Sequence, residues 1–570
     1  APSIALGQTL PPRPQPSLPT EPSSPEKPPL TLPPFQPAET ETIAGEIIVT
    51  EIEIIDNTVI STETLGALAV LESETSINQI NNQVLTFAEL LQIANRVAEY
   101  YAEQGYRTSG AVVVIPEATQ KDGQGLIQIK VIEGRLGQVK VSIQDDDVLD
   151  TRFDHYVGDR LRVREGEVLN VDWLLESLQL LQLDPQIQTL NATLAAAPEA
   201  NTSDLVVTYQ PNNPFQIGVR LDNGQSPDVG SFERGGSIRY NNLIGLGDKL
   251  RIAYMNFDGG DRPEVHYEIP FNADNGSVRF DYIYNSSGII QPPFDDIDLD
   301  GNRPDITSNY EAYDITVRQP IIRGIEDQTF TELGLGLNAS WRNTQSFLFG
   351  EPFPFSLSAD VLGNTRIFAL RFNQDYVQQN PQAVMALFSQ MSLGLGVFGS
   401  SISPDLPDQP IADSDFFAWR GQAQYARRLG ENTLWLTRAN VQLATTSLVA
   451  IEQFSIGGLG SVRGYAQNQL LTDNGVFLST EVRLPILTLP DGDQTGVLQI
   501  IPFVDYGVGW NVELPTPENN NLASVGIGLQ WQLGQFSARL DYGIPLITFD
   551  RPKRDWNENG IYFTIQYGNF

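Results

Sequence analysis

Two hydrophobic periodicities divide the chain into regions. Apolar residues recur at three- and four-residue intervals over residues 86–106 and 170–185, which predicts amphipathic helices. In most of the chain after residue 45, apolar and polar residues instead alternate, which predicts strands with one buried face. Residues 1–44 show neither pattern and are rich in proline, which lacks the N–H donor that helices and sheets need. We therefore expect a disordered tail or linker there.

The first predicted domain spans residues 45–135. Its long helix has Thr86 and Glu89 at the spacing of a capping box, and Gly105 follows its last turn. The predicted elements are a strand, a short helix, the long helix and two strands, at residues 46–55, 62–71, 86–106, 111–115 and 125–134.

A second domain of the same kind is predicted over residues 136–210. Asn170 has the position of a helix N-cap, and Pro185 lies just beyond the end of that helix. The predicted elements are a strand, a helix and two strands, at residues 136–143, 170–185, 186–194 and 203–209. The repetition indicates two tandem α+β modules.

The last predicted domain, residues 211–570, is a transmembrane β-barrel. Residues 523–534 and 536–544 each alternate over nine or more positions. Strands of globular proteins are usually about 5 or 6 residues long, whereas about 9–11 residues cross a bilayer at a tilt. At about 22 residues for each strand and its connection, the region accommodates about 16 antiparallel strands. The predicted fold is therefore mixed, with two α+β domains followed by a 16-stranded barrel.

The amino-acid composition excludes several kinds of partner and site. The chain carries 35 basic and 70 acidic residues, a formal net charge of −35, and no cysteine. Nucleic acid is therefore not an expected partner, and thiol catalysis, disulfides and thiolate metal sites are excluded. His155 and His266 stand apart from other metal-ligand residues, so we interpret them as structural or surface histidines. The chain begins with Ala1, which indicates that a leader has been removed.

A glycine-rich stretch, GGLGSVRGYAQNQLLTDNG, lies in a predicted loop of residues 450–475. Counting back from the C-terminus, this loop joins strands 11 and 12 of a 16-stranded barrel and is its sixth long loop. It contains four consecutive residues of interest: Val462, Arg463, Gly464 and Tyr465.

The next strand but one, residues 497–510, has a continuous apolar face that includes Val504 and Tyr506. This face is expected to meet lipid. The opposite face, which is expected to line the lumen, carries Phe503, Asp505 and Gly507.

These residues carry a family resemblance. The VRGY tetrad in the sixth loop and the F-x-D-x-G pattern of the strand resemble the barrel superfamily that translocates or inserts proteins at outer membranes. The two α+β domains resemble its polypeptide-transport-associated (POTRA) domains. Two such domains behind a proline-rich lead, with a 16-stranded barrel, are similar to the transporters of two-partner secretion, the TpsB or hemolysin secretion/activation family (FhaC/ShlB-like).

The resemblance implies an outer-membrane protein with its N-terminal domains in the periplasm, in contact with outer-membrane lipid. It implies a secreted TpsA-like exoprotein as partner, recognised by an N-terminal secretion domain and held as an added strand at a POTRA sheet edge. It also implies that the sixth loop folds inward and that Arg463 pairs with Asp505. Glu481 and Arg483 share the lumen phase of their strand and are candidates to extend this network.

No catalytic or cofactor chemistry is expected. The chain has no Walker-type glycine loop and no arrangement of nucleophile, base and metal ligands, so we expect no enzymatic activity, nucleotide, metal or other cofactor. Two alternative functions share some of these features. A barrel-insertion factor of the BamA type has the same loop and strand motifs, and a solute porin could carry the POTRA modules.

Two features depart from the family pattern. The prolines of residues 1–44 argue against a long N-terminal helix that plugs the barrel. Phe570 is out of phase with Ile561, Phe563 and Ile565, which predicts a bulge or an unusual register in the last strand.

Overall fold

The computed structural model describes residues 30–31, 46–70, 75–144, 152–297, 299, 301, 304–403, 410–491, 494–549 and 555–568. They form two compact units, an α+β unit that ends at Asn212 and a β-barrel unit that begins at Asn213. Apart from Leu30–Thr31, the predicted tail of residues 1–44 lies outside the described residues, and so does Phe570.

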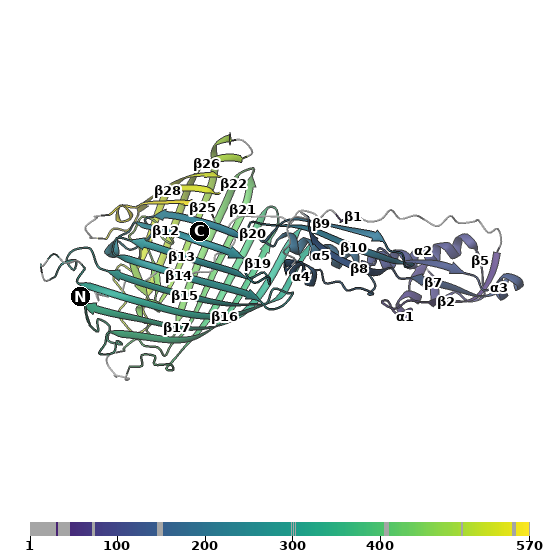
Figure 1. Ribbon diagram of the computed structural model, residues 1–570, viewed down its shortest axis with the longest axis horizontal. Coiled ribbons are helices and arrows are strands. Elements are labelled where there is room, and N and C mark those ends of the chain that lie inside the picture. Colours follow the sequence, from purple (N-terminus) through teal and green to yellow (C-terminus); the bar gives the residue numbers. More distant parts are fainter. Residues whose placement is uncertain are drawn as a thin grey trace. The chain divides into compact units, whose positions relative to one another are not determined.

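The first module is a four-stranded sheet covered by one long helix (Figure 1). The helix, α2, begins after Thr86, whose side chain and that of Glu89 form both hydrogen bonds of a capping box. It ends before Gly105, whose φ of +89° favours glycine. The sheet, in the order β5-β2-β7-β6, and the helices consist of β2 (Glu46–Ile55), α1 (Thr62–Gly66), β5 (Gln83–Thr86), α2 (Phe87–Glu103), β6 (Gly110–Val114), α3 (Glu117–Asp122) and β7 (Gln124–Ile132). The short elements β3 (Ala69–Val70), β4 (Thr75–Ser76) and η1 (Ile77–Gln79) complete the module.

The first strand differs from its predicted pattern. Regular alternation puts Ile48, Ile52 and Ile54 on one face, but the core contains Val49 and Ile54, which have opposite phases. The cause is a β-bulge between Val49 and Glu51 in the pairing of β2 with β7, because one extra residue inverts the alternation. The short strand β5 was not predicted, and α1 is shorter than residues 62–71.

The second module repeats the arrangement with a sheet in the order β1-β9-β10-β8. Asn170 caps α5 by accepting hydrogen bonds from the N–H groups of Asp172 and Trp173, both at 3.1 Å. The elements are β1 (Leu30–Thr31), β8 (Arg135–Ile143), α4 (Arg152–Asp159), α5 (Val171–Gln182), β9 (Ile187–Ala196) and β10 (Thr202–Pro211). Among the helices in the described part of the chain, none is long and apolar enough to cross a membrane.

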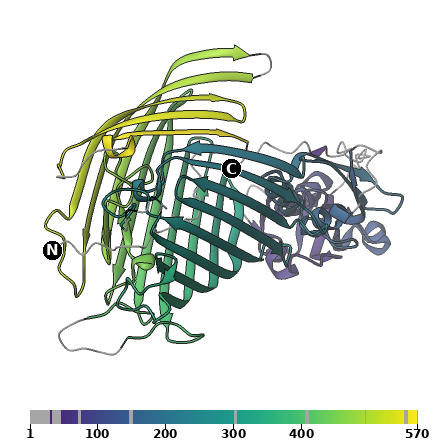
Figure 2. The same ribbon diagram turned by 60° about the vertical axis from the view of Figure 1, so that its left-hand side comes forward.

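The second unit is a closed antiparallel barrel of 16 long strands (Figures 1 and 2). The strands of its first half are β11 (Phe215–Asp222), β12 (Glu233–Asn241), β13 (Lys249–Phe257), β14 (Gly260–Pro270), β15 (Ser277–Gly288), β16 (Ile306–Glu326), β17 (Thr329–Leu348) and β19 (Asn364–Gln379). Those of its second half are β20 (Ala383–Leu395), β21 (Phe417–Gly430), β22 (Thr433–Ala444), β25 (Asn474–Asp491), β26 (Gln494–Trp510), β27 (Asn521–Leu533), β28 (Phe536–Pro545) and β29 (Ile561–Tyr567). Smaller elements in the connections are β18 (Glu351–Pro352), η2 (Pro227–Val229) and η4 (Asn557–Asn559).

The barrel closes where its first strand pairs with its last. Strands β11 and β29 run antiparallel, with Val219 opposite Tyr567 and Asp222 opposite Thr564. In β29, Tyr567 is exposed whereas Tyr562 is fully buried. The last described strand therefore alternates regularly, with its odd-numbered apolar residues directed outward. Its pairings with β11 and β28 show no register shift, so the predicted bulge does not lie within residues 561–567.

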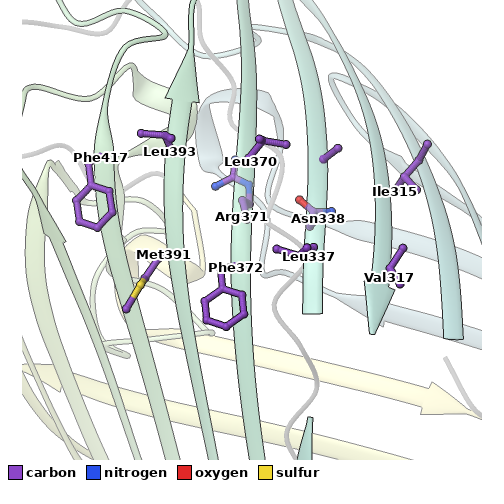
Figure 3. Close-up of a pocket in the computed structure, with 11 residues that line it drawn as sticks. Ile315, Val317, Leu337, Asn338, Leu370, Arg371, Phe372, Met391, Leu393 and Phe417 are labelled. Carbon is purple, nitrogen blue, oxygen red and sulfur yellow. The ribbon is translucent and has the colours of Figure 1, made fainter. Parts of the chain in front are cut away.

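The outer face of the barrel is apolar, as the alternation predicts. On β26, Val504 and Tyr506 are exposed while Phe503 and Asp505 are buried. Figure 3 shows a pocket on the outer wall formed by side chains from β16, β17, β19, β20 and β21, among them Leu337, Leu370, Phe372, Met391 and Leu393. Exposed apolar side chains at alternate positions are typical of strands that face lipid.

Candidate functional site

The connection between β22 and β25, the eleventh and twelfth long strands, is held inside the barrel. We call residues 445–473 the insert. It contains the 3₁₀ turn η3 (Ala450–Glu452) and a small hairpin of β23 (Phe454–Ile456) and β24 (Leu470–Thr472). Its tip, residues 462–465, is buried against side chains that point inward from the last strands of the barrel.

The glycine-rich segment before the tip is a tight turn. Gly457 and Gly458 have φ angles of +113° and +96°, which are strained for any residue with a side chain. The N–H of Gly457 donates to Ser461 Oγ at 2.8 Å, and the N–H of Gly458 donates to the carbonyl of Val462 at 3.1 Å. These glycines therefore reverse the chain direction and aim the tip at the barrel wall.

Arg463 and Asp505 form a buried bidentate pair. Arg463 donates from Nε to Oδ2 at 2.8 Å and from Nη2 to Oδ1 at 2.9 Å. Its backbone N–H also donates to Oδ2, at 3.1 Å. Ser479 Oγ donates to Oδ1 at 2.6 Å. Both charged residues are 1% exposed, so the pair is removed from solvent and its two partners neutralise one another.

Two further carboxylates surround the same guanidinium. Arg463 Nη1 lies 3.0 Å from Glu481 Oε2 and 3.5 Å from Asp541 Oδ1. Arg539 on β28 bridges these carboxylates, at 3.0 Å from Glu481 and 2.7 Å from Asp541. Arg483 pairs with Glu481 at 3.1 Å. The tip thus enters a network of alternating charges on three strands, β25, β26 and β28.

The residues next to Arg463 position the tip through its backbone. The N–H of Gly464 donates to Tyr562 Oη at 2.9 Å, and the same hydroxyl donates to the carbonyl of Tyr465 at 2.5 Å. Tyr465 Oη donates to the carbonyl of Ala523 at 2.8 Å. Gly464 has a φ of +101°, and a Cβ built on Gly543 of β28 would lie 2.6 Å from its nitrogen. Backbone therefore packs directly on backbone where the tip meets the wall.

The strand motif has a separate role for each of its three residues. Phe503 lies under the guanidinium of Arg463, whose central carbon is 3.4 Å from the ring centre. Asp505 neutralises the charge. A Cβ on Gly507 would lie 2.5 Å from the side chain of Ile456 and 3.0 Å from that of Val462, so only glycine leaves room for the insert.

The structure brings the loop motif, the strand motif, Glu481 and Arg483 to one place, and it adds residues that were not predicted, among them Ser479 and Gly543. Arg539, Asp541 and Tyr562 complete the network but belong to no motif. The sequence does carry a signal for Arg539 and Asp541. They are opposite charges two residues apart on the lumen face of their strand, where the other residues are small. Within the described residues, no group of three or more His, Cys, Asp or Glu side chains is arranged to hold a metal ion.

Fold and site together define a class of protein, a 16-stranded outer-membrane barrel with an inward-folded sixth loop, preceded by two POTRA-like modules. Comparison with known proteins agrees with this class. Residues 201–531 match the family described as haemolysin secretion/activation protein ShlB/FhaC/HecB, and residues 47–134 match the ShlB-type POTRA domain. The chain therefore belongs to the haemolysin secretion/activation protein family. It is an outer-membrane protein translocase of two-partner secretion, with its POTRA domains in the periplasm.

Individual relatives are distant but cover most of the chain. The outer membrane transporter CdiB of Escherichia coli is 24% identical over 483 residues, which are 82% of this chain and 74% of the relative. The heme/hemopexin transporter protein HuxB of Haemophilus influenzae is 21% identical over 485 residues, 82% of this chain and 79% of the relative.

Solved structures show the same fold. CdiB from Escherichia coli superposes with a TM-score of 0.69 at 21% identity, covering 95% of this chain and 94% of that one. BamA from Haemophilus ducreyi lacking POTRA domains 1–3 gives a TM-score of 0.51 at 17% identity, covering 91% of this chain and 100% of that one.

Proposed function

We propose that this chain secretes an unfolded partner exoprotein, and that transport requires Arg463 to leave Asp505. The observation that carries the proposal is the buried insert, because a loop that occupies the lumen must move before a polypeptide can pass. The tip is held by a few directional polar contacts on strands β25 to β29. Such contacts break over a short displacement, which suits a part that is held and then released.

The POTRA sheets are the proposed site of capture. An extended polypeptide can add to an exposed sheet edge as another strand, with affinity that comes from backbone hydrogen bonds and makes little demand on sequence. The edge of β9 supports this idea, because it already pairs in parallel with Leu30–Thr31, opposite Ala192 and Thr193. In the first module, β5 and β6 are the edge strands.

The proposed partner is a TpsA-like exoprotein with an N-terminal secretion domain. We propose no enzymatic activity, because the buried charged groups of the insert, Arg463 and Glu452, pair with charged side chains of the barrel strands and their proposed role is to hold and release the insert. The exoprotein is proposed to pass through the lumen of the barrel as an extended chain.

A reconstitution experiment tests the proposal. The full chain is placed in liposomes, and an unfolded polypeptide that carries a TpsA-like secretion domain is added on the POTRA side. We expect the polypeptide to become protected from added protease. We also expect Arg463→Ala to change the rate at which this protection develops. Faster folding of an added barrel protein without translocation would instead assign a BamA-type insertion activity. Ion conductance that Arg463→Ala leaves unchanged, again without translocation, would assign a solute porin.

A further inference from the structure

The insert has a second set of buried contacts, far along its chain from the tip. We call residues 445–453 its neck. The apolar side chains of the neck pack inside the barrel on lumen-facing residues of strands β15, β16, β19 and β21. This apolar cluster consists of Leu448, Val449 and Ile451 from the neck with Ile283, Tyr310, Ala312, Ile367, Ala369, Phe416 and Ala418. The neck is therefore packed on the wall, as the tip is.

Glu452, at the end of the neck, makes buried ion pairs on the same side of the barrel. Its Oε1 lies 3.0 Å from Arg342 Nη1 on β17 and 2.8 Å from Arg371 Nη2 on β19. A second hydrogen bond joins Arg371 Nη1 to Oε2 at 3.3 Å. Glu452 is 3% exposed and Arg371 4% exposed, so these charges depend on one another for neutralisation. Figure 3 shows Arg371 between Leu370 and Phe372, which line the outer pocket of this wall.

Hydrogen bonds from three polar side chains hold the two ends of the insert together at the neck. Gln442 Nε2 donates to the carbonyls of Glu452 and Asp473, each at 2.9 Å. The carboxylate of Asp473 accepts from the N–H of Leu448 at 2.9 Å and from Gln453 Nε2 at 3.2 Å. These bonds tie the neck to β22 and to Asp473, the last residue of the insert.

The tip and the neck use different strands. The side chain of Arg463 bonds to β25, β26 and β28, whereas that of Glu452 bonds to β17 and β19. In the order around the barrel, β17 and β19 are the seventh and eighth long strands, and β25 to β28 are the twelfth to fifteenth. The side-chain contacts of Arg463 and those of Glu452 therefore share no residue, although the N–H of Ser447 in the neck also donates to Glu513, which follows β26, at 3.0 Å.

We propose that Glu452 is a second, independent anchor of the insert. It positions the neck on the β17–β19 wall after Arg463 has left Asp505, so full opening of the lumen requires the release of both. The role in opening rests on the proposed function, whereas the two independent anchors do not.

Cysteine labelling separates the two anchors. The chain has no cysteine, so a single engineered thiol is a clean reporter of exposure. Ser447→Cys reports on the neck, where Ser447 is 3% exposed. Ser461→Cys reports on the turn before the tip, where Ser461 is half-buried and the thiol takes the place of the hydroxyl that accepts from the N–H of Gly457. The full-length protein in liposomes is labelled with a membrane-impermeant maleimide, without any exoprotein. A failure of this test is therefore distinct from a failure of secretion.

We expect the two reporters to respond to different substitutions. Arg463→Gln should raise labelling at position 461 about ten-fold and leave position 447 within about two-fold of the unsubstituted protein. Glu452→Gln should raise labelling at position 447 about ten-fold. Glu431→Gln, the same change at an exposed turn, is the matched control and should alter neither. Equal responses of both reporters to Arg463→Gln, or no response at 447 to Glu452→Gln, would overturn the proposal.

Ion selectivity gives a readout that packing alone would not change. Glu452→Gln removes the carboxylate that pairs with Arg371 and leaves Arg342 with Asp314 at 4.0 Å, so the reversal potential in a salt gradient should shift toward anions. Glu452→Asp keeps the charge and should restore the original selectivity, with a labelling rate at position 447 raised by only about three-fold. This variant keeps the carboxylate but is one methylene shorter, which weakens the ion pairs with Arg342 and Arg371 without removing the charge, so it also tests the anchor if Glu452→Gln fails to fold. An unchanged reversal potential in a folded Glu452→Gln protein, or labelling of Glu452→Asp equal to the unsubstituted rate, would contradict the assignment.

Discussion

The guanidinium of Arg463 lies 3.4 Å from the centre of the Phe503 ring while Asp505, two residues further along the same strand, accepts two of its hydrogen bonds. Successive lumen-facing side chains of a strand are two residues apart, so one face of β26 supplies both the ring and the carboxylate. The two-residue spacing of Phe503 and Asp505 in the F-x-D-x-G motif therefore places the ring beneath the planar guanidinium and the carboxylate at its edge.

Replacement of the ring should loosen the tip without removing any ion pair. Phe503→Leu eliminates a cation–π contact that is worth about 2 kcal/mol when desolvated. We expect faster maleimide labelling at the Ser461→Cys reporter, with the barrel still folded. Phe372→Leu, at an exposed position on β19, should not change the rate.

A charge swap at positions 463 and 505 should fail to restore secretion. Arg463 also faces Glu481 and Asp541, so an aspartate in its place would lie among like charges even with an arginine opposite. We expect Arg463→Asp, Asp505→Arg and the double variant all to be inactive, each with an uncompensated buried charge that costs on the order of 3–5 kcal/mol. Secretion by the double variant equal to the natural rate would show that the pair acts without the surrounding network.

The close approach of two glycine backbones gives a test with a matched control. Gly543→Ala places a methyl group 2.6 Å from the nitrogen of Gly464, so the tip must shift away from β28. Gly236→Ala on β12 meets nothing within 4 Å. Single-channel recording should show a higher open probability for Gly543→Ala only. Equal behaviour of the two variants would mean that the tip tolerates displacement.

Glu133 links the stability of the first module to pH. It accepts hydrogen bonds from the hydroxyl of Thr58, from the N–H groups of Thr58 and Val59, at 2.6 and 3.0 Å, and from Tyr101 Oη at 3.0 Å. Burial acts to raise the pKa of Glu133, but these hydrogen bonds outweigh it, and the pKa lies below its usual range. A lowered pKa contributes stability above the unfolded value of about 4.3, and this contribution is lost as the pH falls through the folded value.

Glu133→Gln should therefore destabilise the module at pH 7 by about 2 kcal/mol, the scale of hydrogen bonds to a charged group. The difference from the natural protein should shrink as the pH falls below the unfolded value of about 4.3 and through the lower folded value. Thermal unfolding of the full chain across this pH range measures both. Glu51→Gln, at an exposed position on β2, should show neither effect.

Much of the fold could be predicted because its strands obey strict alternation. Long alternating runs such as β27 and β28 distinguish a membrane barrel from a sandwich, and the last five strands lie where the pattern places them. The prediction failed locally at β2, because a bulge inverts the phase without leaving a mark in the residue types. The short β5 was missed for a similar reason, since four residues are too few to show a period.

Only those residues of the site that belong to a recognisable sequence motif could be predicted. Arg463 and Asp505 stand out as rare charges beside glycines, whereas Tyr562 resembles any aromatic residue of a barrel strand. Its importance arises only when the closure of the barrel brings β29 next to the tip. Glu452 has no motif at all, and its partners on β17 and β19 lie 81 or more positions away in sequence.

The hydroxyl of Tyr562 connects the tip to the final strand of the chain, and this imposes an order on biogenesis. The last contacts of the insert cannot form until the C-terminal strand, which is synthesised last, has been added to the sheet. Protection of a Ser461→Cys reporter during refolding should accordingly appear after the heat-resistant barrel form, never before it. An insert whose tip is bonded to Tyr562 therefore indicates that the last strand of the barrel is in place.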